Sequence, residues 1–253
     1  MPAHRLYYTD SYTTEFEATV VSTTSAGGRT AVILDRTAFY PASGGQPADT
    51  GRLGGARVID VLERDADDEV LHVIEGDVPA GRVRGVIDWP RRLDHMQQHT
   101  GQHVLSAVFA RRFGAETTSV HFGAERATVD LARALDAEAI AGAEREANEI
   151  VRADRPVSIR FAEAGEAASL GLRRESAREG TLRLVDIAGV DLSACGGTHV
   201  ARTGEIGAIL ITGWERRRGG VRVEFVCGGR AVAGWRARAD ALDQAARGLS
   251  VGP

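Results

Sequence analysis

Cysteine is scarce and lysine is absent in this chain of 253 residues. Its two cysteines, Cys195 and Cys227, are too few for a disulfide framework, and a cysteine found with histidines indicates metal binding or catalysis first. Lysine is absent, so all 31 basic residues are arginine, which codon usage explains more readily than a need for bidentate phosphate contacts. The scarcity of thiols excludes a small disulfide-stapled protein.

The chain also lacks a positive charge surplus and long apolar runs. Its formal net charge of −4 does not by itself indicate a nucleic-acid-binding protein. Residues 1–10 carry charges and tyrosines where a secretory signal needs an apolar stretch, and no apolar run reaches transmembrane length. We therefore expect a cytoplasmic globular protein with neither a membrane nor DNA as partner, and the oligomeric state stays open.

Residues 5–88 have the pattern of short strands and turns. Alternating or β-branched runs, separated by glycine-rich stretches, predict strands at residues 19–23, 30–34, 58–62 and 70–74. Because so many strand edges must be closed or covered, the pattern favours a small barrel or sandwich.

The pattern changes at Asp88-Trp89-Pro90, where an acidic residue and a proline precede a helical periodicity. We expect a long helix from here to about residue 113, ended by a left-handed cap at Gly114. Further helices are expected at residues 136–153 and 230–248, and strands at 119–122, 127–131, 157–161, 182–187, 208–215 and 221–227. Helices separated from runs of strands favour an α+β fold. The expected domains are residues 1–88 and 89–253.

Two histidines, His99 and His103, lie four residues apart in the expected long helix. At this spacing both imidazoles project from one helix face and can bind one metal ion. Cys195 and His199 repeat the four-residue step between later strands, beside glycines that let the backbone turn tightly. A thiolate with imidazoles suits zinc, which accepts sulfur and nitrogen ligands in tetrahedral geometry.

His95, one turn before His99, is an alternative ligand. At the helical rise per residue, His95 and His103 are about 12 Å apart along the axis, too far to share one tetrahedral ion. Spacing alone therefore leaves two pairs open, His95 with His99 or His99 with His103.

Three segments carry a family resemblance: M-Q-Q-H-T-G-Q-H at 96–103, C-G-G-T-H-V at 195–200 and F-Y-P-A-S-G-G-Q-P-A-D-T-G at 39–51. They resemble the editing domain of alanyl-tRNA synthetase and its freestanding relatives, the alanyl-tRNA editing (AlaX) family. The resemblance covers most of the chain and favours the two-domain form. That form has a small N-terminal β-barrel domain, followed by an α+β editing domain in which a long zinc-binding helix packs on an antiparallel sheet.

The resemblance implies a zinc-dependent hydrolase that edits in trans, with the acceptor end of mischarged tRNA(Ala) as partner and serine, or in some members glycine, as the amino acid removed. The family's zinc ligands fall on His99, His103, Cys195 and His199, which leaves His95 outside. Zinc can activate water and polarise the ester carbonyl. Since four protein ligands resemble a closed structural site, one ligand could be weakly held, the ion could expand to five ligands, or it could anchor the substrate while a tRNA hydroxyl activates water.

Recognition of serine requires polar groups that pair with its hydroxyl. The expected catalytic or discriminating residues are Thr100, Gln102, Thr118 and Gln46, and the expected substrate-binding residues are Ser43, Gly44, Gly45 and Ser119. In synthetase editing sites the position of Gln102 is commonly a threonine, so the choice between serine and glycine stays open.

Two other functions remain alternatives. The first is a noncatalytic tRNA-binding module in which zinc only joins the helix to the later strands, and the second is a zinc hydrolase of small esters or amides. Outside the site, Cys227 ends an apolar strand and is expected to be a buried, inert thiol. We expect Trp89, Trp214 and Trp235 to pack in the core or between domains.

Overall fold

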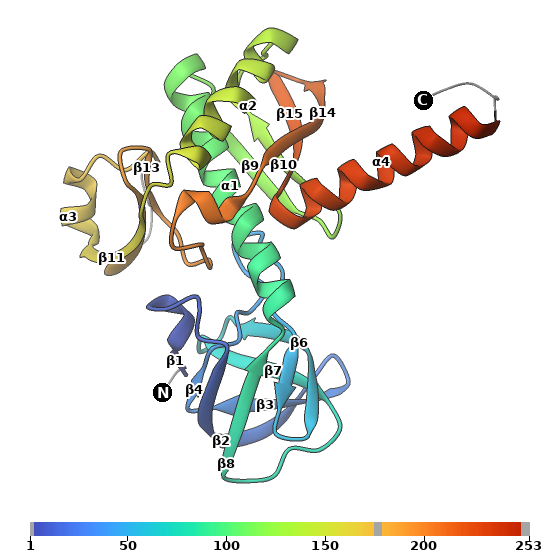
Figure 1. The fold of residues 1–253 in the computed structure, drawn as a ribbon. Helices are drawn as coiled ribbons and strands as arrows, with labels where there is room; N and C mark the ends of the chain where they lie inside the picture. Colours follow the sequence, from blue (N-terminus) through green and yellow to red (C-terminus); the bar gives the residue numbers. More distant parts are fainter. Residues whose placement is uncertain (1–2, 175–178, 249–253) are drawn as a thin grey trace.

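The computed structural model describes residues 3–174 and 179–248, and it has the mixed α+β architecture that the sequence predicts (Figure 1). The N-terminal third forms a closed ring of strands, and the rest of the chain is arranged around one long helix. Within the described ranges, no helix has both the length and the apolar character needed to cross a bilayer.

Six antiparallel strands close on one another in the order β2-β3-β7-β6-β5-β8. In chain order they are β2 (Glu15–Ala26), β3 (Arg29–Leu34), β5 (Gly51–Leu53), β6 (Ala56–Arg64), β7 (Glu69–Glu75) and β8 (Arg82–Ile87). Side chains alternate along them: in β8, Val83 and Ile87 are buried while Arg82 and Arg84 face outward. Phe16 and Phe39 meet inside the ring at a centroid distance of 5.8 Å. Closure gives every strand two neighbours and leaves no open edge.

Short elements complete this part of the chain. They are β1 (His4–Arg5), the 3-10 helix η1 (Leu6–Tyr8) and β4 (Arg36–Thr37), which pairs in parallel with β1. The sequence predicted four of the six ring strands, β2, β3, β6 and β7, and it missed β5 and β8. It also missed the short pieces, which are too short to show a period.

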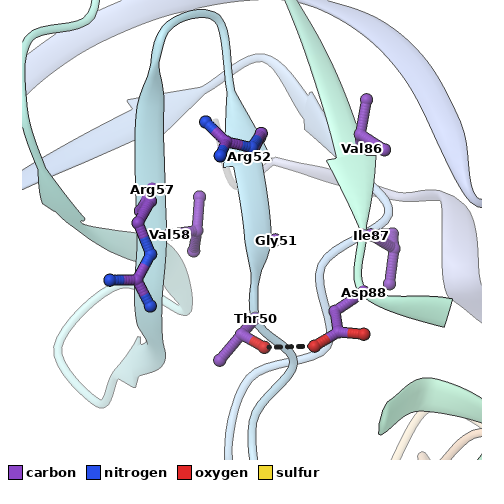
Figure 2. A pocket seen from close by; sticks show the side chains of 8 residues that line it. All are labelled: Thr50, Gly51, Arg52, Arg57, Val58, Val86, Ile87 and Asp88. Carbon is purple, nitrogen blue, oxygen red and sulfur yellow. Dashed lines mark hydrogen bonds between the residues drawn. The ribbon is translucent and has the colours of Figure 1, made fainter. Parts of the chain in front are cut away.

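Helix α1 (Trp89–Phe113) begins directly after β8. Asp88 precedes it in extended conformation, and its carboxylate accepts a hydrogen bond from Thr50 at 3.3 Å (Figure 2). Pro90 lies in the first turn, where no amide donor is needed. Gly114 ends the helix at φ 58°, the left-handed cap predicted from the sequence.

The remaining elements surround α1. They are β9 (Thr117–Phe122), β10 (Ala127–Leu131), α2 (Ala137–Arg152), β11 (Val157–Glu163), α3 (Ala164–Ser169), β12 (Thr181–Ile187), β13 (Asp191–Ala194), the 3-10 helix η2 (Thr203–Ile206), β14 (Ile209–Arg217), β15 (Gly220–Cys227) and α4 (Gly228–Gly248). One antiparallel sheet has the order β14-β15-β10-β9 and a second has the order β11-β12-β13. The largest apolar cluster lies between the first sheet, α1 and α2, and includes Phe109 and Phe225.

A buried ion pair joins the first turn of α1 to the strand ring. Arg92 is fully buried, and its Nε donates to Asp49 at 3.0 Å. The same guanidinium donates to the carbonyl oxygens of Ser11, at 2.8 Å, and Ala38, at 2.5 Å. These contacts fix the direction in which α1 leaves the ring, and this direction positions the histidines two and three turns later.

Three expectations about single residues can be compared with the fold. Cys227 is buried as predicted, and burial raises the pKa of its thiol. Trp89 packs against the large cluster and against Tyr12, at 5.5 Å between ring centroids. For Trp214 and Trp235 the packing prediction is wrong, because their exposed fractions are 38% and 71%. Trp235 lies on α4, which extends away from the rest of the molecule (Figure 1).

Candidate metal centre

Four side chains converge where α1 passes the loop that follows β13. The side-chain nitrogen and sulfur atoms of His99, His103, Cys195 and His199 that can bind a metal all lie within 4.8 Å of one another. The Cys195 Sγ is 3.4 Å from the Nε2 atoms of both His99 and His199. The structure thus brings together the four residues predicted as ligands, and the cluster could hold one metal ion.

Glycines make this close approach possible at two points. A Cβ atom at Gly197 would lie 2.2 Å from Cε1 of His99, so the Cys195 loop can reach the helix only without a side chain there. A Cβ atom at Gly101 would lie 2.3 Å from Sγ of Cys227, at the end of β15. Gly101 therefore lets α1 lie against the sheet at the turn that carries the histidines.

Each of the three histidines is oriented by a hydrogen bond at Nδ1. His99 Nδ1 pairs with Oε1 of Gln46 at 2.8 Å, and His103 Nδ1 pairs with Oδ2 of Asp191 at 2.7 Å. His199 Nδ1 is 3.1 Å from Oγ1 of Thr100. Because the oxygen of each partner can accept a hydrogen bond from Nδ1–H, each Nε2 can face a common ligand, as in metal sites with an ordered outer shell.

Gln46 connects the glycine-rich loop to both halves of the cluster. Its Oε1 also accepts from the backbone of Thr198 at 3.1 Å, and its Nε2 donates to the Thr198 hydroxyl at 2.8 Å. These three bonds use the oxygen twice and one N–H of the amide, in a side chain that is buried. Gln46 therefore acts on the cluster through His99 and Thr198.

Asp191 has a buried position with several charged and polar partners. Its carboxylate accepts from Arg173 Nε at 2.6 Å and from Ser193 Oγ at 2.9 Å, in addition to its bond with His103. Burial alone would raise its pKa, but His103 and Arg173 outweigh burial and lower the pKa to about 2. The group is therefore a carboxylate at neutral pH, and the sequence analysis missed it although it lies four residues before Cys195.

The charges inside the cluster favour a thiolate at Cys195. Burial raises the pKa of this thiol, but His99 and His199 outweigh that effect and hold the pKa well below its ordinary value. Burial and the neighbouring His99 lower the pKa of His199 to about 3. For His103, burial lowers the pKa, but Asp191 and Cys195 raise it to about 9. Since a metal binds the thiolate and the neutral imidazole, its binding would displace the proton that the raised pKa keeps on His103 at neutral pH.

His95, the alternative ligand, is buried in α1 outside the four-residue cluster. Within the described ranges its Nδ1 has no hydrogen-bond partner. Burial, followed by the nearby Arg91, lowers its pKa to about 4. Of the two pairs that the spacing left open, the structure groups His99 with His103.

The other predicted polar residues differ in their distance from the cluster. Gln102 is buried in α1, and its Nε2 donates to Ser106 at 2.8 Å. Thr118 is exposed on β9, where its hydroxyl donates to the carbonyl oxygen of Asp130, and Ser119 beside it is exposed. The hydrogen bonds of the described residues do not link these two to any of the four ligand residues.

A pocket of about 700 Å³ opens beside the cluster. His99 and Cys195 line it, as do Ser43 and Gly44 of the glycine-rich loop and Arg183 of β12. Gly45 instead packs against β9, where a Cβ atom would be 3.3 Å from the carbonyl oxygen of Val120. The pocket thus combines residues from the strand ring with two of the four cluster residues.

A smaller hollow of about 310 Å³ lies on the strand ring (Figure 2). Its walls come from β5, β6 and the end of β8, and they carry Arg52, Arg57 and the hydrogen-bonded pair Thr50 and Asp88. None of the four cluster residues lines it. The pocket of about 700 Å³ is therefore the one that adjoins the four-residue cluster.

Comparison with known proteins places this site in a family. Residues 182–224 match the family model described as "Threonyl and Alanyl tRNA synthetase second additional domain". The alanyl-tRNA editing protein AlaX-M of Methanosarcina acetivorans is 38% identical over 225 residues, which cover 81% of this chain and 91% of the relative. The chain belongs to the alanyl-tRNA editing (AlaX) family.

Longer relatives in this family match as well. AlaX-L of Pyrococcus horikoshii is 35% identical over 240 residues, which are 90% of this chain and 59% of that protein. The alanyl-tRNA editing protein Aarsd1 of Mus musculus is 35% identical over 261 residues, covering 95% of this chain and 62% of that protein. This AlaX-family chain therefore spans about three fifths of the length of these two relatives.

Proposed function

We propose that the protein is a zinc-dependent deacylase that edits mischarged tRNA(Ala) in trans. Membership of the AlaX family supports an aminoacyl-tRNA deacylase. Within this proposal seryl-tRNA(Ala) is the first substrate, glycyl-tRNA(Ala) the second, and the acceptor end enters the pocket of about 700 Å³. The observation that carries the proposal is the cluster of His99, His103, Cys195 and His199 at the wall of that pocket.

The donor set fits zinc. One thiolate and three imidazole nitrogens match the soft and borderline ligands that zinc accepts, and their mutual spacing suits a single tetrahedral ion. When bound, zinc would supply Lewis acidity that polarises an ester carbonyl and lowers the pKa of a nearby water. His99 and Cys195 face the pocket, so we propose that the ester approaches on their side and that any ligand exchange occurs there.

The residues of the chain have separate roles in this proposal. Gln46 and Thr100 position His99 and His199 through their Nδ1 atoms. Ser43 and Gly44, which line the pocket, contact the substrate. In this proposal Gln102, Thr118 and Ser119 recognise the amino acid. Gly45 shapes the glycine-rich loop.

We further propose that residues 1–88 and 89–253 act as two domains that build the site together. The bond between Gln46 and His99 supports this arrangement, because it joins residues 53 positions apart across the proposed boundary. The first domain would then contribute both a pocket wall and the orientation of one ligand.

The test is deacylation of seryl-tRNA(Ala), with alanyl-tRNA(Ala) as the comparison, by the zinc-loaded protein and by Cys195→Ser and His103→Ala. We expect the native protein to release serine much faster than alanine, and both variants to lose this activity while remaining folded. Equal rates for the native protein and the variants would contradict the proposal.

The same experiment separates the alternatives. A zinc hydrolase of small esters would cleave seryl esters that carry no tRNA, and a tRNA on the ester would not raise the rate. If the metal only joins α1 to the later strands, His103→Ala unfolds the protein, and substitutions at Gln102 leave tRNA binding unchanged. Circular dichroism beside the activity assay distinguishes these results.

A further inference from the structure

Arg183 is a buried arginine whose charge is not compensated by an ion pair within the described ranges. It lies on β12, and its exposed fraction is 7%. Nε donates to the carbonyl oxygen of Tyr8 at 2.8 Å, and Nη1 donates to the carbonyl oxygen of Cys195 at 2.7 Å. Its third nitrogen, Nη2, is buried without a hydrogen-bond partner among the described residues.

A comparison with Arg92 shows how unusual this arrangement is. Arg92 is also buried, but Asp49 neutralises it and all of its nitrogens donate to protein oxygens. Burying a charge without a counter-charge is costly, so such groups are usually paired or reserved for a ligand. Two carbonyl oxygens and the ring of Tyr8, 5.6 Å away, hold the Arg183 guanidinium rigidly.

The residue that carries the unpaired nitrogen lines the pocket that adjoins the metal centre. Arg183 lines this pocket together with Cys195 and His99. Tyr7 lines it too, and its hydroxyl is likewise buried without a partner among the described residues. Arg183 and Tyr7 therefore both line the pocket and both carry an unused hydrogen-bonding atom just behind its surface, and one of the two side chains is cationic.

The carboxylates of the pocket do not neutralise Arg183. Glu63 is paired with Arg5, whereas Asp65, Asp68 and Glu179 are exposed, so solvent and salt screen their charges. Inside, the guanidinium offers N–H donors in the planar geometry that suits phosphate oxygens. The ligand that best completes it is an anion that lies close to the metal centre.

We propose that Arg183 binds a non-bridging oxygen of the phosphate on the 5′ side of the terminal nucleoside, whose 3′ ester lies at the metal centre. This proposal rests on the proposed function, since it assumes a nucleotide ester in the pocket. The position of Arg183 supports it, because Nη1 donates to the carbonyl oxygen of Cys195 and Nη2 is bonded to the same guanidinium carbon. Arg183 would fix the distance between the nucleic-acid backbone and the scissile ester.

Two pairs of small probes test this contact. The first pair is the 3′-seryl ester of adenosine and the 3′-seryl ester of adenosine 5′-monophosphate, compared by kcat/KM. The second is adenosine and adenosine 5′-monophosphate, compared by calorimetric binding to the zinc-loaded protein. A charge-assisted hydrogen bond predicts that the native protein prefers the phosphorylated member by about 10- to 100-fold in both pairs.

Substitution of Arg183 should remove only this preference. In Arg183→Gln we expect nearly equal values for the two members of each pair, and in Arg183→Lys an intermediate preference. Arg160→Gln is the matched control, because Arg160 lies on the neighbouring strand β11, is paired with Asp186 and does not line the pocket. Zinc content and the visible spectrum of the cobalt-substituted protein should be the same in all variants.

The outcomes are distinct. Absence of a phosphate preference in the native protein overturns the proposal without any variant, and so does a preference that survives in Arg183→Gln. Equal loss on both members of a pair, with an altered cobalt spectrum, shows that Arg183 only supports the Cys195 loop and also overturns it. If the native protein hydrolyses neither ester, the calorimetric pair alone decides whether Arg183 binds phosphate, and the proposed function is decided separately by deacylation of seryl-tRNA(Ala).

Discussion

Asp191 offers the sharpest test of how the metal centre is built. Its side chain is fully buried and bonds to His103 Nδ1 at 2.7 Å and to Arg173 Nε at 2.6 Å. In Asp191→Asn the side chain keeps its size but loses its charge. The new amide NH₂ group then faces N–H and O–H donors from which the carboxylate had accepted hydrogen bonds. His103 then loses the partner that fixes its ring and raises its basicity.

The size of the effect follows from the role of such outer-shell partners. Their loss typically lowers metal affinity 10- to 100-fold, which corresponds to about 1.4 to 2.7 kcal/mol. The carboxylate and the Cys195 thiolate together balance the charge of a divalent ion, so we expect the upper part of this range. Asp191→Glu should not restore the affinity, because a longer side chain has no room beside Ser193 and Arg173.

Zinc affinity would be measured by competition with a chromogenic chelator, and the ligand geometry by the visible absorption of the cobalt-substituted protein. Asp186→Asn is the control, because Asp186 lies on β12 of the same sheet but pairs with the exposed Arg160. An unchanged zinc affinity in Asp191→Asn, or an equal loss in the control, would refute the reasoning.

Three further substitutions test the fold around the site. Gly101→Ala places a Cβ atom 2.3 Å from Cys227 Sγ, so we expect a loss of about 1 to 3 kcal/mol in urea unfolding, and an unchanged midpoint would contradict the close contact. Asp49→Ala leaves Arg92 buried and unpaired, which should cost about 3 to 5 kcal/mol, whereas Asp67→Ala at an exposed pair should cost little. Burial lowers the pKa of His72 from its ordinary value of about 6.5 to about 4. Between pH 6.5 and pH 4 mainly the unfolded chain binds a proton at this residue, so the free energy of unfolding falls as the pH falls. This contribution is at most about 3 kcal/mol, and His72→Gln should flatten the pH dependence of the unfolding free energy in that window, while an unchanged slope would count against it.

The sequence alone predicted features that lie within one element, such as the bounds of α1. Pro90 and Gly114 bound α1 because the restricted backbone of proline and the left-handed conformation of glycine act within one turn. The four-residue step from His99 to His103 is likewise a property of a single element. The thiol and imidazoles of the later loop indicated a metal through their chemistry alone.

The partners of these residues depended on contacts between distant segments. Gln46 lies 53 residues from His99 and bonds to it only because Arg92 and Asp49 direct α1 away from the strand ring. Asp191 became recognisable as a partner of His103 only once β13 lay beside the helix. Spacing could not choose between His95 and His103, since both lie one turn from His99.

The sequence by itself determined the three longest helices, most of the strands, the family and the set of residues able to bind a metal, because periodicity, capping and ligand chemistry are local. The tertiary structure decided which polar groups orient the imidazoles, which nitrogen of Arg183 stays free and which tryptophans meet solvent. Those properties depend on which surfaces meet when the elements pack together, and a pattern within one segment carries no information about the segment that will cover it.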